Sequence, residues 1–479
     1  MVTLGGLMSR VDHGARSKLN FNVVGDEAVA ISDVTNDSRS VRAGAMFCCV
    51  RGERFDGHDF AVDAARHGAA ALLVDHQIPG VRVPQVLASD TREAMGHLAA
   101  AFHDHPSRSL TVVGVTGTNG KTTTAHMIGS ILEGSGKRTR VLGTLSGART
   151  TPEAPELQRT LADERAAGTQ AVVMEVSSHA LALKRVAGMR FAAAVFTNLG
   201  HDHLDFHGSH EAYFAAKASL FSTDFADRAV VNRDDAYGRK IAENCDIPVK
   251  TFGHGDASDV HITAAGSEFT WRSVRLQCAV GGEFNVMNAL AASTTAVELG
   301  VDIRDVVNGL ANLPQIPGRF ENVNVDGGFA VLVDYAHTPE ALRNVISAAR
   351  SVGNSPARGG SRVVVVFGCG GERDPSKRPD MGTASCLADR VIVTSDNPRR
   401  EDPEAIIAAI VSGISSAERT KVSIEVDRRR AIETACREAR TGDVVVIAGR
   451  GHETKQSIGG TEVEFSDAEV ARAVLRGLR

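Results

Sequence analysis

The chain has 479 residues, of which 43% are hydrophobic and 23% charged, and its formal net charge is −5. The composition is typical of a globular protein, and the length predicts about three domains because a single core rarely grows so large. An acidic chain with one Trp and three Tyr offers neither the basic surface nor the aromatic platform of a general nucleic-acid binder.

Two polar, proline-bearing stretches divide the chain into three predicted domains, residues 1–107, 108–315 and 316–479. The first stretch is H-D-H-P-S-R-S at residues 103–109, and the second is L-P-Q-I-P-G-R-F at residues 313–320. Clusters of this kind between periodic segments are typical of linkers.

Short apolar runs alternate with helical patterns in all three domains, which indicates an α/β fold. In chain order, strands are predicted at residues 45–50, 69–75, 110–116, 170–176, 191–197, 229–232, 329–335, 362–368, 390–394, 421–426 and 443–449. Helical patterns lie between them, for example at residues 404–414. The near-continuous apolar strands favour mainly parallel sheets covered on both faces, with ligands beyond the carboxyl ends of the strands.

Seven cysteines are scattered along the chain without a C-x-x-C pair, which indicates reduced thiols. The first residues lack the basic start and long apolar core of a signal peptide. No apolar run approaches the ~18 residues of a membrane span. We therefore expect a cytoplasmic monomer with neither a membrane nor a nucleic-acid partner.

A phosphate-binding loop is predicted at G-V-T-G-T-N-G-K-T-T-T, residues 114–124, between a strand and a helix. Glycines let the backbone wrap phosphate oxygens, Lys121 supplies a positive charge, and Thr122 offers a hydroxyl to Mg²⁺. Val115 departs from the strict G-x-x-x-x-G-K-[ST] spacing. An ordinary Gly-rich turn before a helix is the alternative interpretation.

Glu175 ends the apolar run V-V-M-E of the predicted strand 170–176, where a carboxylate beside the phosphate loop can hold Mg²⁺; a capping or salt-bridged glutamate is the alternative. The next motif, F-T-N-L-G-H-D-H-L-D-F-H-G at residues 196–208, carries three histidines. Zinc is disfavoured because this stretch contains neither a cysteine nor an H-E-x-x-H helix. Either the histidines are solvated loop residues, or one joins Glu175 at a second magnesium.

Nine sequence blocks in order resemble the Mur ligases of peptidoglycan synthesis, a family of three-domain ATP-dependent amide-bond ligases. They are G-T-N-G-K-T-T, E-V-S-S-H-A-L, T-N-L-x-x-D-H-L-D-x-H-G, Y-F-A-A-K, G-E-F-N-V-M-N-A-L-A-A, I-P-G-R-F-E, V-D-Y-A-H-T-P, G-C-G-G-E-R-D and A-G-R-G-H-E. The resemblance covers all three predicted domains. It implies an N-terminal domain for a UDP-sugar, a central P-loop ATPase domain, and a C-terminal Rossmann-like domain for an amino acid.

The resemblance implies a set of ATP contacts, two Mg²⁺ ions and a carbamylated lysine. The ATP contacts are Gly117, Thr118, Asn119, Gly120, Lys121, Thr122, Thr123, Asn285, Asn288, Arg319 and Asp334. The metal ligands are Thr122, Glu175, His203 and Lys217, and the catalytic residues are Lys121, Glu175, His203 and Lys217. Lys217 would be a carbamate, because an unmodified ammonium repels Mg²⁺. Without the resemblance, Lys217 is interpreted as an exposed helix lysine, Asn285 and Asn288 as a helix cap, and Arg319 and Asp334 as surface salt-bridge residues.

Within the family, the S-S-H-A-L block and an N-terminal D-S-R motif resemble the branch that adds the third stem-peptide residue to UDP-N-acetylmuramoyl-L-alanyl-D-glutamate. The implied contacts to this substrate are Ser38, Thr150, Thr151, Ser177 and Arg185. For the threonines, a turn before Pro152 is the alternative. Leu183 departs from the family, which often has an amide two residues before the arginine.

The stretch S-D-N-P-R-R, residues 395–400, follows the predicted strand 390–394. A guanidinium pairs bidentately with a carboxylate, so it favours meso-diaminopimelate, which ends in a second amino-acid head, over L-lysine, which ends in an ammonium. D-N-P-R resembles the diaminopimelate-selecting signature of the family. The implied contacts are Arg373, Asp396, Asn397, Pro398, Arg399, Gly449 and Glu453. A turn before a helix capped by Asp402 is the alternative.

The expected activity is ATP-dependent ligation of diaminopimelate to the D-glutamate γ-carboxylate through an acyl phosphate. Alternatives are an L-lysine-adding or other Mur-type ligase, a folylpolyglutamate synthetase and, in a different class, a regulatory P-loop GTPase. The stretch V-V-N-R-D-D at residues 230–235 mimics the guanine-reading N-K-x-D motif, although Arg233 replaces the lysine. A GTPase switch would also not need a further α/β domain with its own ligand loop.

Overall fold

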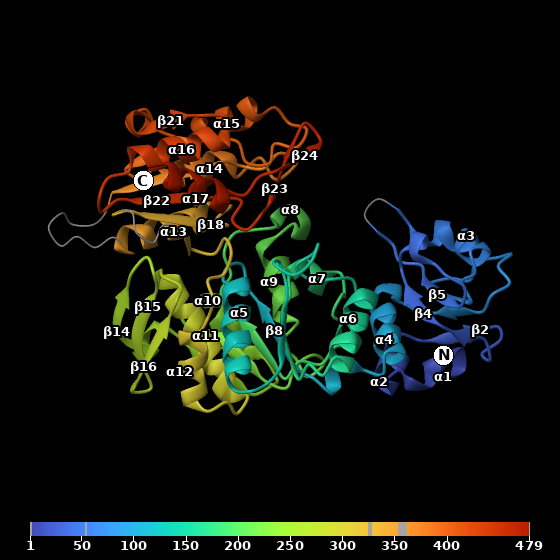
Figure 1. Ribbon diagram of the computed structural model, residues 1–479. Coiled ribbons are helices and arrows are strands. Elements are labelled where there is room, and N and C mark those ends of the chain that lie inside the picture. Colours follow the sequence, from blue (N-terminus) through green and yellow to red (C-terminus); the bar gives the residue numbers. More distant parts are fainter. Residues whose placement is uncertain (1, 53–54, 324–327, 353–361, 479) are drawn as a thin grey trace.

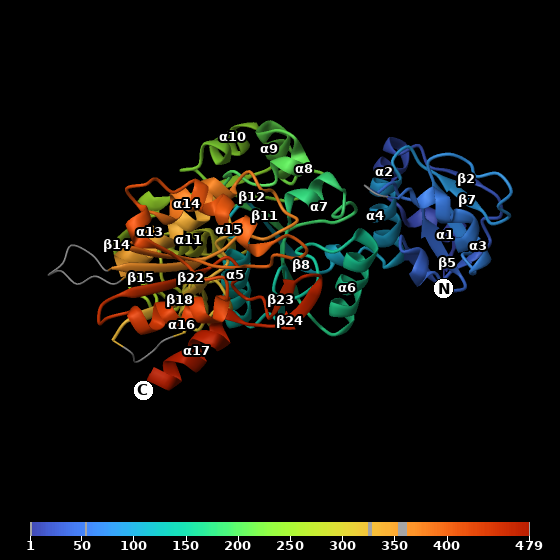
Figure 2. The same cartoon turned by 90° about the horizontal axis from the view of Figure 1, so that it is seen from above.

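The computed structural model describes residues 2–52, 55–323, 328–352 and 362–478. They form three α/β units, each built on its own sheet (Figure 1). The N-terminal unit lies at one end of the molecule, and the other two units pack against each other (Figures 1 and 2). The fold-class prediction is confirmed.

The N-terminal unit is a five-stranded sheet in the order β2-β7-β6-β5-β4, and only β2 runs antiparallel to its neighbour. Its elements are β1 (Val2–Thr3), α1 (Leu4–Arg10), α2 (His13–Lys18), β2 (Asn22–Val24), β3 (Ala30–Ile31), β4 (Asp33–Thr35), β5 (Ala45–Cys48), α3 (Ala61–Arg66), β6 (Ala71–Val74), β7 (Gln85–Leu87) and α4 (Thr91–Phe102). Short 3₁₀ turns lie at Ser38–Ser40, Gly57–Phe60 and Pro106–Arg108. The last of these turns leads into the central unit.

The central unit is a parallel six-stranded sheet in the order β13-β12-β11-β8-β10-β9. Its elements are β8 (Thr111–Thr116), α5 (Lys121–Gly134), β9 (Thr139–Leu142), α6 (Ala154–Ala166), β10 (Ala171–Glu175), α7 (Ser178–Ala182), β11 (Ala193–Phe196), α8 (Leu204–His207), α9 (His210–Ala218), β12 (Ala229–Asn232), α10 (Ala236–Asn244), β13 (Val249–Phe252), β14 (Ala257–Ile262), β15 (Ser267–Trp271), β16 (Val274–Cys278), α11 (Glu283–Glu298) and α12 (Ile303–Ala311), with a 3₁₀ turn at His254–Asp256. The carboxyl ends of β8 and β10 therefore lie side by side.

Both faces of the central sheet are covered because its strands are apolar at successive positions. Val113 and Val115 of β8 pack with α5 and α11, whereas Val112 packs on the opposite face with residues of α6, α9 and α10. The antiparallel sheet β14-β15-β16 was not predicted. β15 alternates buried and accessible residues, β14 has no buried residue, and the three strands are less apolar than those of the parallel sheet.

The C-terminal unit is a six-stranded sheet in the order β17-β18-β22-β19-β20-β21, parallel except at β17. Its elements are β17 (Glu321–Asn322), β18 (Ala330–Asp334), α13 (Pro339–Val352), β19 (Val363–Phe367), α14 (Arg378–Ser385), β20 (Arg390–Val393), α15 (Pro403–Ser412), β21 (Val422–Ile424), α16 (Arg428–Glu438), β22 (Val444–Ala448), β23 (Lys455–Ile458), β24 (Thr461–Glu464) and α17 (Asp467–Leu478), with a 3₁₀ turn at Arg419–Lys421. The hairpin β23-β24 was not predicted.

Apolar packing continues from the central unit into the C-terminal unit. Val286 of α11 and Val345 of α13 belong to one buried cluster. Among the described residues, no helix combines the length and the apolar content that crossing a membrane would require.

Candidate active site

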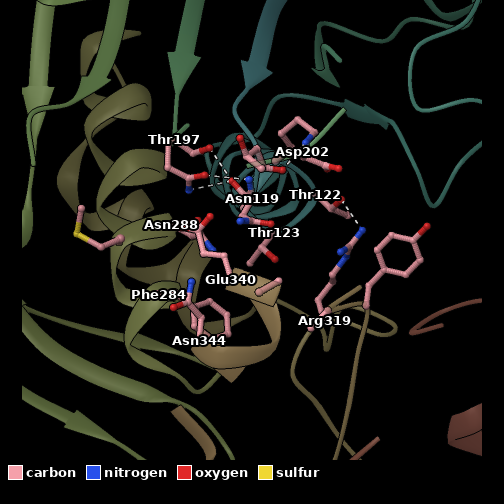
Figure 3. Close-up of a pocket in the computed structure, with 18 of the residues that line it drawn as sticks. Asn119, Thr122, Thr123, Thr197, Asp202, Phe284, Asn288, Arg319, Glu340 and Asn344 are labelled. Atoms are coloured by element: carbon pink, nitrogen blue, oxygen red, sulfur yellow. Dashed lines mark hydrogen bonds between the residues drawn. The ribbon is translucent and has the colours of Figure 1, made fainter. Parts of the chain in front are cut away.

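A cavity of about 710 Å³ lies between the central and C-terminal units (Figure 3). Of the predicted site residues, its wall contains Thr118, Asn119, Gly120, Lys121, Thr122, Thr123, Thr150, Glu175, Ser177, His203, Lys217, Asn288, Arg319 and Asp334. A volume of this size can hold a nucleotide-sized ligand. Ser38, Gly117, Thr151, Arg185, Asn285 and the predicted diaminopimelate contacts do not line it.

The phosphate loop connects the end of β8 with the start of α5. Gly120, whose φ is +86°, caps the helix, and a Cβ there would meet the Asn288 Oδ1 atom at 2.4 Å. Lys121 Nζ donates to the carbonyls of Gly117 and Thr118, each at 2.9 Å. Burial lowers the pKa of Lys121. A helix N-terminus and an ammonium therefore share one end of the cavity, which suits a phosphate chain.

Two oxygen ligands lie together beside this loop. The Thr122 hydroxyl donates to Glu175 Oε2 at 2.9 Å, and the backbone N–H of Thr144 donates to Glu175 Oε1 at 2.8 Å. Glu175 is buried at the carboxyl end of β10. A hydroxyl and a carboxylate oxygen in contact form a donor set that suits Mg²⁺.

Replacing Glu175 by glutamine is expected to raise the Mg²⁺ concentration for half-maximal ATP turnover by at least about tenfold, because the negative ligand oxygen is lost. The amide keeps the shape of the side chain. The measurement is a Mg²⁺ titration of ADP formation, with the exposed Glu156→Gln on α6 as the control. An unchanged Mg²⁺ requirement would remove Glu175 from the ligand set.

Lys217 of α9 is buried, so its interpretation as an exposed helix lysine is wrong. Its Nζ donates to the Gly117 carbonyl at 2.8 Å and lies 4.7 Å from the centre of the Tyr213 ring. Burial, with the nearby charge of Lys121, lowers the pKa of Lys217 well below its ordinary value. Burial next to the phosphate loop therefore disfavours the charged form of Lys217.

His203 precedes α8 in a left-handed conformation, with φ +55°. Its Nε2 atom lies 3.4 Å from Asp202 Oδ2, and its ring contacts the ring of His179 at 4.7 Å between centroids. The side chain is 44% exposed, yet it belongs to the cavity wall. Its position is compatible with a metal ligand at this cavity.

The C-terminal unit completes the cavity wall beside the phosphate loop. Arg319 Nη2 donates to the Thr122 hydroxyl at 3.0 Å across the interface, as Figure 3 shows. The guanidinium also lies 4.7 Å from the centre of the Tyr335 ring. Asp334 accepts hydrogen bonds from the backbone N–H groups of Phe320 and Ala336, and burial raises its pKa.

The two asparagines of α11 have different positions. Asn288 lines the cavity, whereas Asn285 lies beneath it and accepts a hydrogen bond from Asn288 Nδ2 at 2.8 Å. Asn285 in turn donates to the Gly281 carbonyl. Asn285 therefore orients Asn288 through its carbonyl oxygen.

Four of the predicted UDP-sugar contacts cluster behind Glu175. The Thr151 hydroxyl donates to the Glu175 carbonyl and accepts from the Ser177 backbone N–H. Arg185 reaches the Thr151 carbonyl and pairs with Glu153 at 2.8 Å. The fourth, Thr150, lines the cavity. Ser38, by contrast, begins a 3₁₀ turn in the N-terminal unit.

The predicted diaminopimelate contacts form a second cluster beyond the carboxyl ends of β19, β20 and β22. Asn397 donates to Glu453 Oε2 at 2.7 Å, and Arg399 Nη1 donates to the Gly371 carbonyl at 2.6 Å. Gly449 has a φ of +111°, and a Cβ there would meet Asp396 Oδ2 at 2.6 Å. Three loops therefore converge at one place.

The alternative interpretation, a turn before a helix capped by Asp402, is correct for the helix start: Asp402 caps α15 by accepting from the Glu404 backbone N–H. The loop before it is nevertheless fixed by contacts of its own. Arg399 adopts φ +55°, and its N–H donates to the Ser457 carbonyl of β23. Burial, together with the charge of Asp396, raises the pKa of Glu453.

Several residues of the cavity wall were not predicted from the sequence: Asp202, Phe284, Met287, Tyr335, His337, Glu340 and Asn344. Phe284 and Met287 flank the predicted asparagines on α11. Glu340 and Asn344 are one turn apart on α13 and share a face. The helical spacing was a usable signal once the asparagines had been identified.

In the stretch at residues 230–235, which mimics a guanine-reading motif, Arg233 stands at the lysine position. Arg233 pairs with Asp256 through two hydrogen bonds of 2.8 Å each, outside the cavity wall. The position that a lysine would occupy in a GTPase is therefore engaged in a salt bridge of the central unit.

Three family models match the chain: "Mur ligase family, catalytic domain" at residues 30–103, "Mur ligase middle domain" at 115–296, and "Mur ligase, glutamate ligase domain" at 318–451. A UDP-N-acetylmuramoyl-L-alanyl-D-glutamate–2,6-diaminopimelate ligase of Syntrophomonas wolfei is 44% identical, over 93% of this chain and 95% of its own length. The protein of the same name from Gloeobacter violaceus is 45% identical, over 93% and 94%.

Solved structures show the same architecture. The structure of a UDP-N-acetylmuramoyl-L-alanyl-D-glutamate–2,6-diaminopimelate ligase is 33% identical, with a TM-score of 0.67 over 94% of this chain and 95% of its own. The MurF ligase of Thermotoga maritima in complex with ADP has a TM-score of 0.62 at 22% identity, over 93% and 98%. At that identity the second likeness concerns the fold alone.

Proposed function

The chain belongs to the Mur ligase family, and we propose that it joins meso-2,6-diaminopimelate to the D-glutamate γ-carboxylate of UDP-N-acetylmuramoyl-L-alanyl-D-glutamate, with ATP converted to ADP and phosphate. The observation that carries this proposal is the 44–45% identity, over 93% of the chain, to relatives named as ligases of this kind. The alternative is a lysine-adding ligase of the same family.

The reaction has two steps. An oxygen of the γ-carboxylate attacks the γ-phosphorus of ATP, so that a carboxyl–phosphate bond forms and ADP leaves. The amine of diaminopimelate then attacks the acyl carbon, loses a proton and expels phosphate. Lys121 and the N-terminus of α5 offset the negative charge of the phosphates, and Arg319 brings a further charge from the C-terminal unit.

Two Mg²⁺ ions are part of this proposal. Thr122 and Glu175 would hold the first, and Glu175, His203 and a carbamylated Lys217 the second. Bound Mg²⁺ would supply positive charge that lowers the repulsion between carboxylate and triphosphate. The contact between Thr122 and Glu175 supports the first site, and the buried amine of Lys217 supports its conversion to a carbamate, which requires an unprotonated nitrogen.

Replacing Lys217 by methionine is expected to lower the rate of ADP formation by roughly 100-fold, because a proposed ligand of the second Mg²⁺ is lost. Wild-type protein incubated with ¹³C-bicarbonate should show a carbamate carbon by NMR that is missing from the variant. A wild-type spectrum without that signal would contradict the carbamate, whatever the activity.

The predicted domain limits, residues 1–107, 108–315 and 316–479, are retained in the proposal. The N-terminal unit with Ser38 would bind the UDP end of the substrate, and Thr150, Thr151, Ser177 and Arg185 its muramoyl-peptide. The protein would act as a cytoplasmic monomer that supplies peptidoglycan precursors, and its seven free cysteines agree with the reducing compartment.

The route through an acyl phosphate can be tested by isotope transfer. With ¹⁸O in the D-glutamate γ-carboxylate of the UDP-substrate, the released phosphate should carry one ¹⁸O atom by mass spectrometry. Phosphate without ¹⁸O in a reaction that forms the amide would contradict carboxylate attack on ATP.

A further inference from the structure

Three charged side chains are fully buried behind the diaminopimelate cluster: Arg428, Arg450 and Asp467. Arg428 opens α16 and Asp467 opens α17. Arg428 Nε and Nη2 donate to the two carboxylate oxygens of Asp467, each at 2.7 Å. This is a bidentate pair with 0% exposure on both sides.

The remaining donors of Arg428 bind the backbone at the start of two loops. Nη2 donates to the Ala448 carbonyl at 2.8 Å, and Nη1 donates to the Ser395 carbonyl at 3.3 Å. Ala448 directly precedes Gly449, and Ser395 directly precedes Asp396. The Ala448 carbonyl ends β22 and the Ser395 carbonyl follows β20, and β19 lies between these two strands in the sheet. One guanidinium thus links the two loops across an intervening strand.

Arg450 extends the same cluster toward the ligand loops. Its Nη1 lies 3.6 Å from Asp467 Oδ1, and its Nε lies 3.6 Å from Glu453 Oε2. Its Nη2 donates to the carbonyls of Lys455 and Phe465, on either side of the hairpin β23-β24. Asp467 is therefore the carboxylate shared by two buried guanidinium groups.

A buried ion pair is weak evidence for stability, because apolar residues of similar volume often do as well. The planar guanidinium of such a pair is instead well suited to holding backbone carbonyls at fixed relative positions. In the C-terminal unit, the two carbonyls bound by Arg428 belong to the residues that directly precede the predicted diaminopimelate contacts Asp396 and Gly449.

We propose that Asp467 and Arg428 are positioning residues for the amino-acid site: the pair fixes the loops 395–399 and 449–453 relative to each other, and so sets the affinity for diaminopimelate. The inference rests on the proposed function for its ligand. Neither side chain lines the nucleotide cavity.

The test compares Asp467→Asn and Arg428→Lys with a matched control, Asp443→Asn. Asp443 is also buried and pairs with Arg362 at 2.8 Å, but it precedes β22 and so lies at the opposite end of the same strand. For Asp467→Asn and Arg428→Lys we expect KM for diaminopimelate to rise roughly 10- to 100-fold, with KM for ATP within about twofold of wild type. Asp443→Asn should leave both constants near wild type. Asp467→Glu, which keeps the carboxylate, should raise KM for diaminopimelate less than Asp467→Asn does.

Hydrogen exchange of the free protein gives a second readout that does not depend on activity. Amides of residues 395–400 and 449–453 should exchange faster in Asp467→Asn and Arg428→Lys than in Asp443→Asn, while those of β8 and α5 keep their protection. An equal rise of all KM values, or unchanged exchange in both loops, would overturn the inference. If the wild-type protein does not use diaminopimelate, the proposed function fails, and hydrogen exchange still decides whether the pair holds the loops.

Discussion

Replacing Lys121 by methionine is expected to lower ATP-dependent phosphate release by at least about 1,000-fold. Methionine keeps the length and fits the half-buried site, but it removes the charge that lies at the N-terminus of α5. Two negatively charged partners, a carboxylate and a triphosphate, must approach each other in the first step. The loss should therefore fall mainly on the rate of the chemical step, measured as ADP formation in a single turnover.

The matched control for this change is Lys250→Met, which removes an exposed lysine from β13 at the edge of the same sheet. Its activity should stay within about twofold of wild type, because exposed charges far from the site contribute little. Thermal unfolding of both variants establishes that the fold is retained. Substantial single-turnover activity in a folded Lys121→Met protein would contradict the role of the phosphate loop.

Replacing Arg399 by alanine is expected to lower kcat/KM for diaminopimelate by roughly 1,000-fold, while the low activity with lysine changes little. The distal carboxylate of diaminopimelate would lose its bidentate partner, and lysine has no such group to lose. The backbone of Arg399 is left-handed and its N–H donates to the Ser457 carbonyl, and its guanidinium is held separately, because Nη1 donates to the Gly371 carbonyl at 2.6 Å.

Arg400 is the control for this prediction, since it is the adjacent residue and exposed. Arg400→Ala should retain the preference for diaminopimelate, which separates a specific contact from the general positive charge of the loop. Two results would contradict the contact between Arg399 and the distal carboxylate. One is an equal loss of activity in Arg399→Ala and Arg400→Ala, and the other is an equal fall of kcat/KM for lysine and diaminopimelate in Arg399→Ala.

Much of the fold was accessible from the sequence because the parallel strands are short, apolar and bounded by polar loops. The strand predicted at residues 110–116 corresponds to β8, and the strand predicted at 443–449 corresponds to β22. The antiparallel strands β14–β16 were missed because they carry many polar residues on accessible positions, so no apolar run identifies them.

The site could be predicted in part, because its residues lie at or directly after the carboxyl ends of strands, as Glu175 does at the end of β10. Burial of Lys217 was not accessible from its own helix, since it results from packing against the phosphate loop, about a hundred positions earlier. The contact of Arg319 with Thr122 joins two units of the molecule, and no local pattern predicts such a contact.

The most direct test of the proposed function is phosphate release with ATP, Mg²⁺ and UDP-N-acetylmuramoyl-L-alanyl-D-glutamate, supplied in parallel with meso-diaminopimelate or L-lysine. The ordered D-N-P-R loop predicts release that depends on diaminopimelate and is at least about 100-fold weaker with lysine. Equal or faster release with lysine would contradict the selectivity assigned to Arg399. If protein that binds ATP releases no phosphate with either amine, UDP-N-acetylmuramoyl-L-alanyl-D-glutamate is not its substrate.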